Sequence, residues 1–294
     1  MIFVYNTGRI EREVKAMNMN KVWFITGCSE GGIGAGIARG VLAKGYRAVV
    51  TARDLSRIGS VAADYPETAL PLALDVTDPQ SIREAVRAAT ERFGQIDVLV
   101  NNAGYCYRSS VEEAEMDGVM RMYETNFFGP VRLIQAVLPG MRERRSGAIV
   151  NVSSIGAVRT GAASGYYAST KAALELMSEG LRAELDPLGI KVMIVEPGAF
   201  RTHFYDSSLK GSENRISDYS GTAWLRSVAQ SRNPGTQPGD PGKAGDALIE
   251  AIERDDTPLR LLLGSDAVRV VRAALQARLD ELDKWEAVSI KTDF

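Results

Sequence analysis

Short apolar runs alternate along most of this chain with longer segments in which apolar residues recur every three to four positions. The runs lie at residues 21–25, 46–52, 70–76, 96–100, 148–152, 190–195 and 259–263. Runs of this length without polar alternation are typical of strands buried on both faces of a sheet. The segments between them have the spacing of amphipathic helices. Strands and helices in strict alternation predict a parallel sheet with right-handed crossovers.

The fold that this pattern predicts is α/β, with a single Rossmann-type doubly wound parallel sheet of about seven strands and helices on both faces. We expect helices after the first and fifth strands, and at residues 79–93, 111–141, 244–252 and 266–285. A single domain is expected over residues 21–285, with residues 1–20 and 286–294 as loose tails. Met17 or Met19 is a candidate for the natural start.

Composition and charge argue against several classes of partner. A chain of 294 residues with 45% hydrophobic residues can bury a full core. Its net charge of -2 favours neither nucleic acid nor an anionic membrane as a partner. No apolar run approaches the ~18 residues of a spanning helix, and the apolar start breaks too early for a signal peptide. We therefore expect a cytoplasmic protein without membrane insertion.

Cysteine and histidine content narrows the chemistry further. Cys28 and Cys106 have no metal-site spacing and are too few for a disulfide framework, so we expect free thiols in a reducing compartment. His203 is the only histidine, which makes a Ser-His-Asp hydrolase or a multi-histidine metal centre very hard to build. Proton transfer then falls to tyrosine, lysine or a carboxylate.

A glycine-rich segment at residues 26–34 joins the first strand to the following helix. Glycines let the backbone approach a pyrophosphate closely, and the helix start offers free N–H groups and a favourable dipole. A flexible surface turn is the alternative, but the position between a strand and a helix strengthens the binding interpretation. The candidate cofactor-binding residues here are Gly27, Ser29, Gly32, Ile33 and Gly34.

The ends of the next two strands bear on the choice of cofactor. A carboxylate at the end of the second strand usually selects NAD, whereas an arginine suits the 2′-phosphate of NADP. Here Ala52 takes the acidic position and Arg53 follows it, so NADP(H) is favoured over NAD(H). Asp54 could instead bind the ribose, and Arg53 could project into solvent. Asp75 ends the third strand, before Val76, and could accept a hydrogen bond from an adenine amino group.

Tyr167 and Lys171 lie one turn apart in the helix after the fifth strand. A nearby ammonium favours the phenolate and lowers the tyrosine pKa from about 10, towards the range useful for proton transfer. This spacing also arises by chance in unrelated proteins. The Ser153-Ser154 pair follows the fifth strand, at the edge where such sheets place ligands. Asn126 and a neighbouring glycine predict a kink inside the 111–141 helix.

The chain resembles the short-chain dehydrogenase/reductase family over about residues 20–285. The matching motifs are residues 26–34, Asp75-Val76, residues 101–104, Asn126, Ser154, Tyr167-x-x-x-Lys171 and Pro197-Gly198 with Thr202. The family's intervals select Ser154 over Ser153 and Tyr167 over Tyr166. One departure is an extra residue in the glycine segment, which leaves open whether Gly31 or Gly32 takes the middle position. Glu30 stands where some NADP-using members have a basic residue.

The resemblance implies a carbonyl–alcohol oxidoreductase that uses a nicotinamide cofactor. Tyr167 would donate the proton, Ser154 would stabilise the substrate oxygen, and Lys171 would lower the tyrosine pKa and hold the ribose. Asn126 would position a water that links Lys171 to solvent. Further cofactor contacts would come from Asn102, Ala103, Gly104, Pro197, Gly198 and Thr202.

Partners and substrate are less sharply defined by the sequence. Family members commonly pair through the helices that hold Asn126 and Tyr167, which implies a homodimer or homotetramer. A long irregular segment, about residues 199–242, is expected to form a substrate loop. Its apolar residues could line a pocket for a sizeable apolar carbonyl or alcohol, or could simply hold the loop closed: Phe204, Tyr205, Leu209, Tyr219, Trp224 and Leu225. The alternatives are a nucleotide-sugar epimerase or dehydratase, and a non-catalytic dinucleotide-sensing regulator.

Overall fold

The computed structural model describes residues 21–205, 209–225 and 235–294. Its main sheet has seven parallel strands, as expected, and their order in the sheet is β3-β2-β1-β4-β6-β7-β9. The strands are β1 (Val22–Ile25), β2 (Arg47–Ala52), β3 (Ala69–Ala73), β4 (Val98–Asn101), β6 (Gly147–Val152), β7 (Ile190–Pro197) and β9 (Arg260–Leu263). The predicted N-terminal tail, residues 1–20, lies outside the described residues, and so do Met17 and Met19, the candidates for the natural start.

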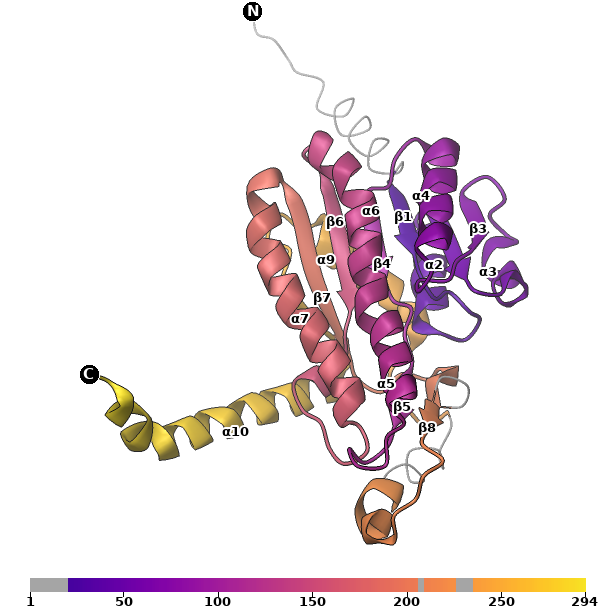
Figure 1. Ribbon diagram of the computed structural model, residues 1–294. Coiled ribbons are helices and arrows are strands. Elements are labelled where there is room, and N and C mark those ends of the chain that lie inside the picture. The colour runs from indigo at the N-terminus through magenta and orange to yellow at the C-terminus, as the bar shows by residue number, and fades with distance from the viewer. Residues whose placement is uncertain (1–20, 206–208, 226–234) are drawn as a thin grey trace, which may run out of the picture.

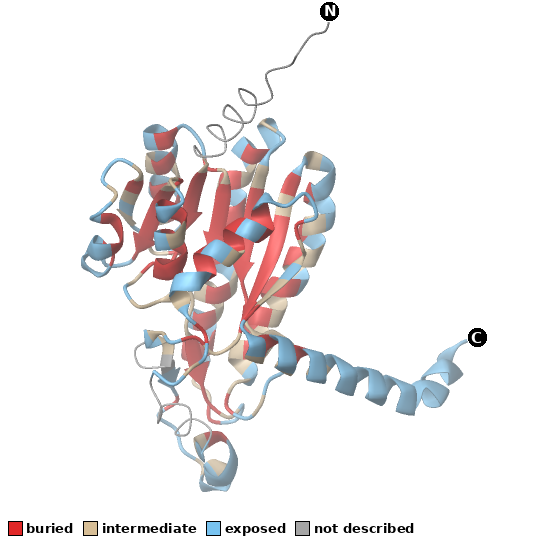
Figure 2. Cartoon of the chain, turned by 180° about the vertical axis from the view of Figure 1, so that it is seen from behind, coloured by how far each residue is buried: buried red, intermediate tan, exposed pale blue. Residues whose placement is uncertain are grey.

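Helices cover both faces of the sheet (Figure 1). On one face α2 (Ile33–Ala43) and α9 (Ala244–Glu253) pack against each other and against the strands, together with the short α3 (Gly59–Ala62). On the other face lie α4 (Pro79–Phe93), α6 (Gly129–Glu143) and α7 (Gly165–Leu185). Figure 2 shows the inner strands buried between these two layers, which explains why their sequences are apolar without alternation.

Parallel pairing brings the carboxyl ends of the strands to one edge of the sheet. Ile25 of β1 pairs with Val50 of β2 and Val100 of β4, and Val152 of β6 pairs with Val195 of β7. The segments that leave β1, β4, β6 and β7 therefore emerge side by side. These are the segments on which the sequence places the candidate site residues.

The helix expected over residues 111–141 is interrupted, as Asn126 and its neighbouring glycine predict. A first helix, α5 (Met116–Tyr123), passes through a π-helical turn over Glu124–Phe128 into α6. The helical structure begins at Met116, five residues later than expected, because residues 111–115 form a turn whose carboxylates hold the substrate loop. Asn126 lies inside the π turn and is fully buried.

The expected irregular segment, about residues 199–242, contains short regular elements that were not predicted. Strand β8 (Leu209–Gly211) pairs in parallel with β5 (Cys106–Arg108), which follows β4. A π-helical turn over Ser220–Trp224 follows. Three-residue strands carry too little sequence pattern to be recognised, and their pairing joins segments about a hundred residues apart.

The last helix, α10 (Ser265–Ser289), runs four residues beyond the predicted end at 285, so the prediction of a loose tail from residue 286 is wrong at its start. A further 3-10 turn covers Ile290–Thr292. Residues 280–289 include good helix formers and polar residues spaced four apart, and these local features favour continuation of the helix. Figures 1 and 2 show α10 projecting away from the body.

The base of α10 is tied to the site edge of the sheet. The Asp266 carboxylate accepts a hydrogen bond from the backbone N–H of Ala199 at 2.8 Å. A Cβ at Gly198 would lie 2.4 Å from the same carboxylate, so only glycine fits there without a shift. Among the described residues, no helix is long and apolar enough to cross a membrane.

Candidate active site

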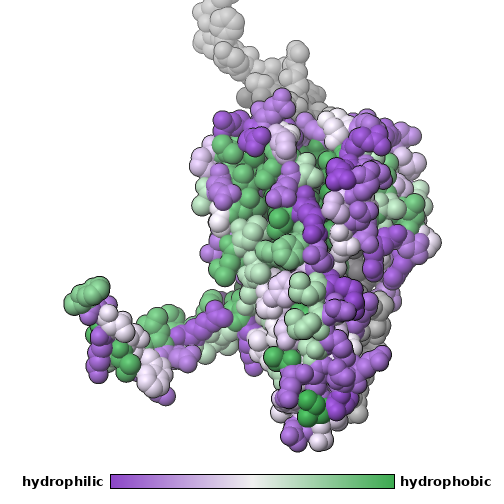
Figure 3. All heavy atoms as spheres, viewed as in Figure 1, coloured by the Kyte–Doolittle hydropathy of each residue, from purple (hydrophilic) through white to green (hydrophobic). Residues whose placement is uncertain are grey.

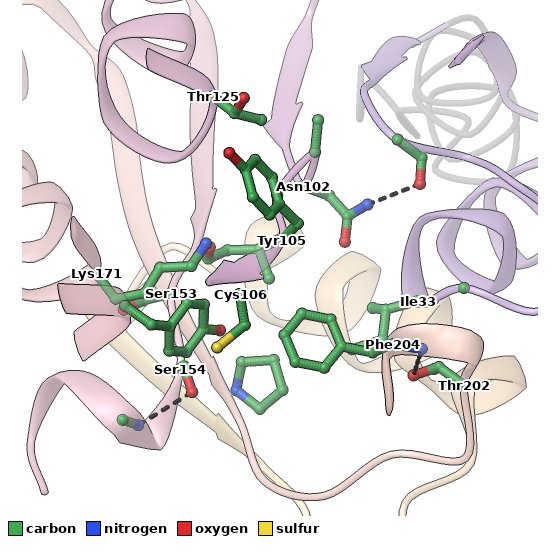
Figure 4. Close-up of a pocket in the computed structure, with 18 of the residues that line it drawn as sticks. Ile33, Asn102, Tyr105, Cys106, Thr125, Ser153, Ser154, Lys171, Thr202 and Phe204 are labelled. Carbon is green, nitrogen blue, oxygen red and sulfur yellow. Dashed lines mark hydrogen bonds between the residues drawn. The ribbon is translucent and has the colours of Figure 1, made fainter. Parts of the chain in front are cut away.

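A cavity of about 1040 Å³ lies at the carboxyl edge of the sheet. Most of the predicted site residues line it: Gly27, Ser29, Gly32, Ile33, Arg53, Asp75, Val76, Asn102, Ala103, Gly104, Ser154, Tyr167, Lys171, Pro197, Gly198 and Thr202. Figure 4 shows part of this lining. Gly34 and Asn126 are buried and do not line the cavity. Their influence on a ligand must pass through the residues they contact.

The glycine-rich turn resolves the question left by its extra residue. Gly27 and Gly31 have φ of 69° and 72°, a backbone conformation that favours glycine. Gly32 has an extended φ of -94° and caps the start of α2. Gly31 therefore makes the turn, and Gly32 begins the helix whose free N–H groups face the cavity. A Cβ at Gly34 would lie 2.4 Å from the Asn102 side chain, so Gly34 permits this close packing.

Asn102 holds that turn in shape. Its side-chain amide donates hydrogen bonds to the carbonyls of Thr26, at 2.8 Å, and Gly27, at 3.0 Å. The Thr26 hydroxyl in turn accepts the backbone N–H groups of Asn102 and Ala103, both at 2.9 Å. The segment after β4 and the turn after β1 thus form one unit. This rigid, glycine-rich cradle at a helix start fits the diphosphate of a dinucleotide.

At the end of β2, the two candidate groups for the ribose lie differently. Arg53 lines the cavity, as does Arg57, which the sequence reasoning missed. Asp54 instead caps a 3-10 turn, since its carboxylate accepts hydrogen bonds from the backbone and hydroxyl of Ser56 at 2.9 and 2.7 Å. The Ser56 hydrogen bonds hold the pKa of Asp54 below its ordinary value. The cavity wall near Arg53 is therefore cationic.

Glu30, the acidic residue in the glycine turn, also has partners within the protein. Its carboxylate accepts hydrogen bonds from Ser60 and from Arg39. These hydrogen bonds lower the pKa of Glu30. Its charge is thus largely balanced, which reduces its repulsion of an anionic ligand. Asp75 is similarly engaged, because one carboxylate oxygen accepts the N–H and the hydroxyl of Thr77 at 2.9 and 2.7 Å.

Lys171 is held at the inner end of the cavity. Its ammonium donates a 2.9 Å hydrogen bond to the backbone carbonyl of Val152, and the residue is only 5% exposed. Burial lowers the pKa of Lys171 to about 8, although the charges of Glu175 and Cys106 oppose this fall. Tyr167 lies one turn earlier on α7, with its ring 6.0 Å from that of Phe204. The pair is therefore fixed from the sheet side and covered from the substrate loop.

The two serines after β6 differ in direction. The Ser153 hydroxyl donates a 2.6 Å hydrogen bond to Glu175, and the residue is buried. The Ser154 hydroxyl accepts the N–H of Gly156 at 3.0 Å (Figure 4) and can still donate its own proton. A Cβ at Gly156 would lie 3.2 Å from the Ser154 hydroxyl and 3.5 Å from the Tyr167 ring. Ser154 and Tyr167 thus flank the same glycine.

A partly buried group of charges lies behind α7. Arg260 of β9 lies 3.4 Å from both Glu175 and Glu196, and it also pairs with Glu179. Burial raises the pKa of Glu175 and raises that of Glu196 to about 7. Sequence reasoning missed this group, although Glu175 follows Lys171 by one helical turn and could have been noticed on that spacing.

Asn126 contacts the loop next to the cavity. Its amide nitrogen donates to the carbonyl of Tyr105 at 2.9 Å and to the hydroxyl of Thr170 at 3.2 Å, and its oxygen accepts the N–H of Tyr105 at 3.1 Å. A Cβ at Gly104 would lie 3.1 Å from the Asn126 oxygen and 3.4 Å from the Lys171 nitrogen. Asn126 therefore fixes the backbone that passes beside Lys171.

The substrate side of the cavity includes residues that the sequence did not reveal. Cys106 and Arg108 of β5 both line it and are almost fully buried, with Arg108 close enough to Cys106 to influence its pKa. The Nε and Nη1 atoms of Arg108 have no hydrogen-bond partner among the residues that the structure describes. Burial still raises the pKa of Cys106 overall, and both cysteines are free thiols.

The apolar residues expected to line the pocket divide into two groups. Phe204 lines the cavity, whereas the Tyr219 hydroxyl donates to Glu112 at 2.6 Å and the Trp224 indole to Glu113 at 2.8 Å. Leu225 is 63% exposed. These three residues do not line the cavity. The hydrogen bonds of Tyr219 and Trp224 to the turn before α5 favour the alternative, in which they hold the loop. The Tyr205 and Leu209 side chains lie outside what the structure describes.

The short chain dehydrogenase family model matches residues 21–212, a range that includes the glycine turn, Ser154, Tyr167 and Lys171. The chain belongs to the short-chain dehydrogenase family. The match covers the sheet from β1 to β7 and ends inside the substrate loop. Among the described residues no cluster of histidine, cysteine and carboxylate side chains could hold a metal ion.

Relatives extend the similarity to nearly the whole chain. The oxidoreductase BOA17 of Botryotinia fuckeliana is 35% identical over 275 residues, 92% of this chain and 99% of that protein. A short-chain dehydrogenase from Streptomyces avermitilis is 42% identical, with a TM-score of 0.85, over 93% of this chain and 100% of that chain. An alcohol dehydrogenase from Thermococcus sibiricus, complexed with 5-hydroxy-NADP, is 26% identical, with a TM-score of 0.67, over 83% of this chain and 95% of that chain. This member of the short-chain dehydrogenase family is thus an oxidoreductase.

Proposed function

We propose that this short-chain dehydrogenase interconverts a carbonyl group and an alcohol with NADP(H). The observation that carries the proposal is the arrangement within one cavity: Ser154, Tyr167 and Lys171 lie at one end, and the glycine cradle at the start of α2 at the other. The nicotinamide cofactor, when bound, supplies or accepts the hydride. The protein's contribution is to orient the substrate and to move the proton.

The proton chemistry belongs to Tyr167. The buried ammonium of Lys171, one helical turn away, favours the phenolate and makes the phenol a better acid at neutral pH. Ser154 donates a hydrogen bond to the substrate oxygen and stabilises the charge that develops there. Asn126 keeps the Tyr105 backbone in place beside Lys171. A water held there would connect Lys171 to solvent.

Selection of NADP(H) rests on the charges at the end of β2. Arg53 and Arg57 both line the cavity, while Asp54 is engaged by Ser56 and is not part of the lining. The relative from Thermococcus sibiricus was solved with a modified NADP. We expect Arg53→Ala to weaken NADPH binding about tenfold to a hundredfold, because a charged hydrogen bond contributes about 1.5–3 kcal/mol. NADH binding, measured by calorimetry on the same variant, is the internal control and should hardly change.

The substrate we propose is a carbonyl or alcohol with a sizeable apolar body. Phe200, Phe204 and Val270 provide apolar surface in the cavity wall. Arg108 adds a buried donor for a polar group on the same molecule. We also propose a cytoplasmic location and a homodimer or homotetramer formed through the outer faces of α5, α6 and α7. Met120, Phe128 and Leu176 are exposed on these elements.

The decisive test is Tyr167→Phe, assayed as NADPH oxidation with a panel of ketones and aldehydes. Loss of the general acid should lower the rate about 10²- to 10⁴-fold. Tyr166→Phe is the matched control, because its hydroxyl donates to the Val111 carbonyl at 3.3 Å, outside the cavity lining. An unchanged rate in Tyr167→Phe excludes the proposed acid. Binding of NADPH without turnover in the wild-type protein would favour the regulator alternative.

A further inference from the structure

The apolar side chains on the outer part of α10 are left exposed by the part of the chain that the structure describes. Only Ala267 and Val271 are buried in this helix, and every described residue after Val271 is exposed or half-buried. Leu275, Leu279 and Leu282 are 49%, 54% and 60% exposed. Figure 3 shows hydrophobic atoms at the surface of the projecting helix, among hydrophilic ones. A helix that stands alone in water is marginally stable, so this face calls for a partner.

The exposed leucines form a stripe along one side of α10. Val268, Leu275, Leu279 and Leu282 follow one another at spacings of seven, four and three residues, which keeps them on one face. The side turned to the body borders this stripe, because Arg278, one turn from both Leu275 and Leu282, donates a 2.9 Å hydrogen bond to the Val158 carbonyl while the leucines stay exposed. A second helix can therefore lie along the leucine stripe beside the body.

Charge along α10 changes sign at the middle of this stripe. Residues 268–279 contain three arginines and no acidic residue: Arg269, Arg272 and Arg278. Residues 280–289 contain four acidic residues and one lysine: Asp280, Glu281, Asp283, Glu286 and Lys284. The basic half of one helix therefore complements the acidic half of an identical helix only when the two run in opposite directions.

We infer that α10 pairs in antiparallel fashion with α10 of a second copy of this chain, about a two-fold axis near Leu279. The leucine stripes then meet, with Leu275 opposite the partner subunit's Leu282. Arg272 lies near the partner subunit's Glu286, and the symmetry repeats the contact. This surface is separate from the outer faces of α5, α6 and α7, so both can operate in one assembly. The pairing does not depend on the proposed reaction.

The same charges disfavour a lipid surface as the partner. Helices that lie on membranes have lysine and arginine on the polar face, which anionic headgroups attract. Here the outer half of α10 is acidic, so an anionic membrane would repel the end that projects farthest. Parallel pairing of two copies would also place like charges together.

The first test is the mass of the full chain at micromolar concentration by light scattering, for wild type and for Leu279→Arg. The variant should halve the mass of the assembly, from two chains to one, or from four to two where another two-fold face also pairs. Val288→Arg is the matched control, since Val288 is 54% exposed on the same helix but off the stripe. It should keep the wild-type mass. Equal masses for wild type and Leu279→Arg would overturn the inference.

Orientation is tested by cross-linking and by charge reversal. Leu279→Cys should form a disulfide-linked dimer under mild oxidation, whereas Lys284→Cys on the opposite side should not; Cys28 and Cys106 are buried and add little background. Arg272→Glu should weaken association, and Arg272→Glu combined with Glu286→Arg should restore it. No cross-link at Leu279→Cys overturns the antiparallel pair. A single-chain wild type that binds phosphatidylserine vesicles, with binding lost in Leu279→Arg, would overturn it in favour of lipid.

Discussion

Two long helices of this protein, α7 and α10, show how differently the fold can use amphipathic sequence. α7 has 21 residues and lies against β6 and β7, with eight buried residues, among them Lys171, Glu175 and Ser178. α10 has 25 residues and buries two. Both begin at the carboxyl edge of the sheet, at Gly165 and Ser265. One carries the candidate chemistry and the other extends into solvent.

The difference teaches that a buried polar side chain becomes chemically useful when its surroundings hold it. On α7 the ammonium of Lys171 is held by the Val152 carbonyl, and Glu175 is held by Ser153 and Arg260. Burial then shifts the pKa values of both groups. On α10 the charged side chains beyond the base remain in water, where their interactions are weak. A reactive group needs the buried environment of α7, whereas an association surface uses exposed side chains such as those of α10.

The largest effect should come from breaking the packing of α7. Leu174 is 1% exposed and lies one turn after Lys171, so Leu174→Ala leaves a cavity beneath the active-site helix. We expect it to lower the free energy of unfolding by about 2–5 kcal/mol. Urea denaturation followed by circular dichroism measures this. A loss below about 1 kcal/mol would show that α7 is not packed as described.

A smaller and more selective effect should follow from Glu175→Gln. The substitution keeps an acceptor for Ser153 but removes a negative charge that favours the ammonium of Lys171. The pKa of Lys171, about 8 in the native protein, should therefore fall. As the pH is raised, activity that needs the charged lysine should then be lost at a lower pH than in the wild type. At pH 8 we expect a rate roughly twofold to tenfold below wild type, with near-equal rates at pH 6.

The pH profile of Glu175→Gln has a matched control in Glu179→Gln. Glu179 pairs with the same arginine, Arg260, but lies one turn farther from Lys171 and is 42% exposed at its side chain. Its alkaline limb should stay where it is in the wild type. A shift of equal size in both variants would assign the effect to Arg260 rather than to the charge next to Lys171.

The smallest effect should come from the exposed face of α10. Val288 is 54% exposed and lies away from the leucine stripe, so Val288→Ala removes little buried surface. We expect the free energy of unfolding to change by less than about 0.5 kcal/mol. The same urea titration used for Leu174→Ala measures it. A loss comparable to that of Leu174→Ala would mean that this part of α10 is covered.

Much of the sheet could be predicted because each inner strand is a short local run whose apolar character reflects burial on both faces. β3 accommodates Pro71 because it lies at the edge of the sheet, where a missing N–H is tolerated. The kink at Asn126 was predicted for a similar reason, because asparagine and glycine disfavour a helix interior. Strands β5 and β8 were missed because three residues are too few for a pattern.

The candidate site was predictable to the extent that strand ends and helix turns place residues. The positions of Ser154, Tyr167 and Lys171 follow from β6 and from the helical repeat. The hydrogen bond from Ser153 to Glu175 could not be predicted in this way, because Glu175 lies 22 residues farther along the chain. Arg260, which pairs with Glu175, lies a further 85 residues away. The hydrogen bonds by which Tyr219 and Trp224 hold the substrate loop could not be predicted either, because their partners, Glu112 and Glu113, lie about a hundred residues earlier.

By itself, the sequence determined the order of strands and helices along the chain, the glycine turn and the spacing of Tyr167 and Lys171. These features depend on residues that are close together in the sequence. The tertiary structure alone decided that Ser153 is engaged by Glu175, which carboxylates lie behind Lys171, and that the leucines of α10 stay exposed. Those outcomes depend on contacts between distant segments. Only the packing of those segments decides which side chains are buried, with shifted pKa values, and which stay exposed.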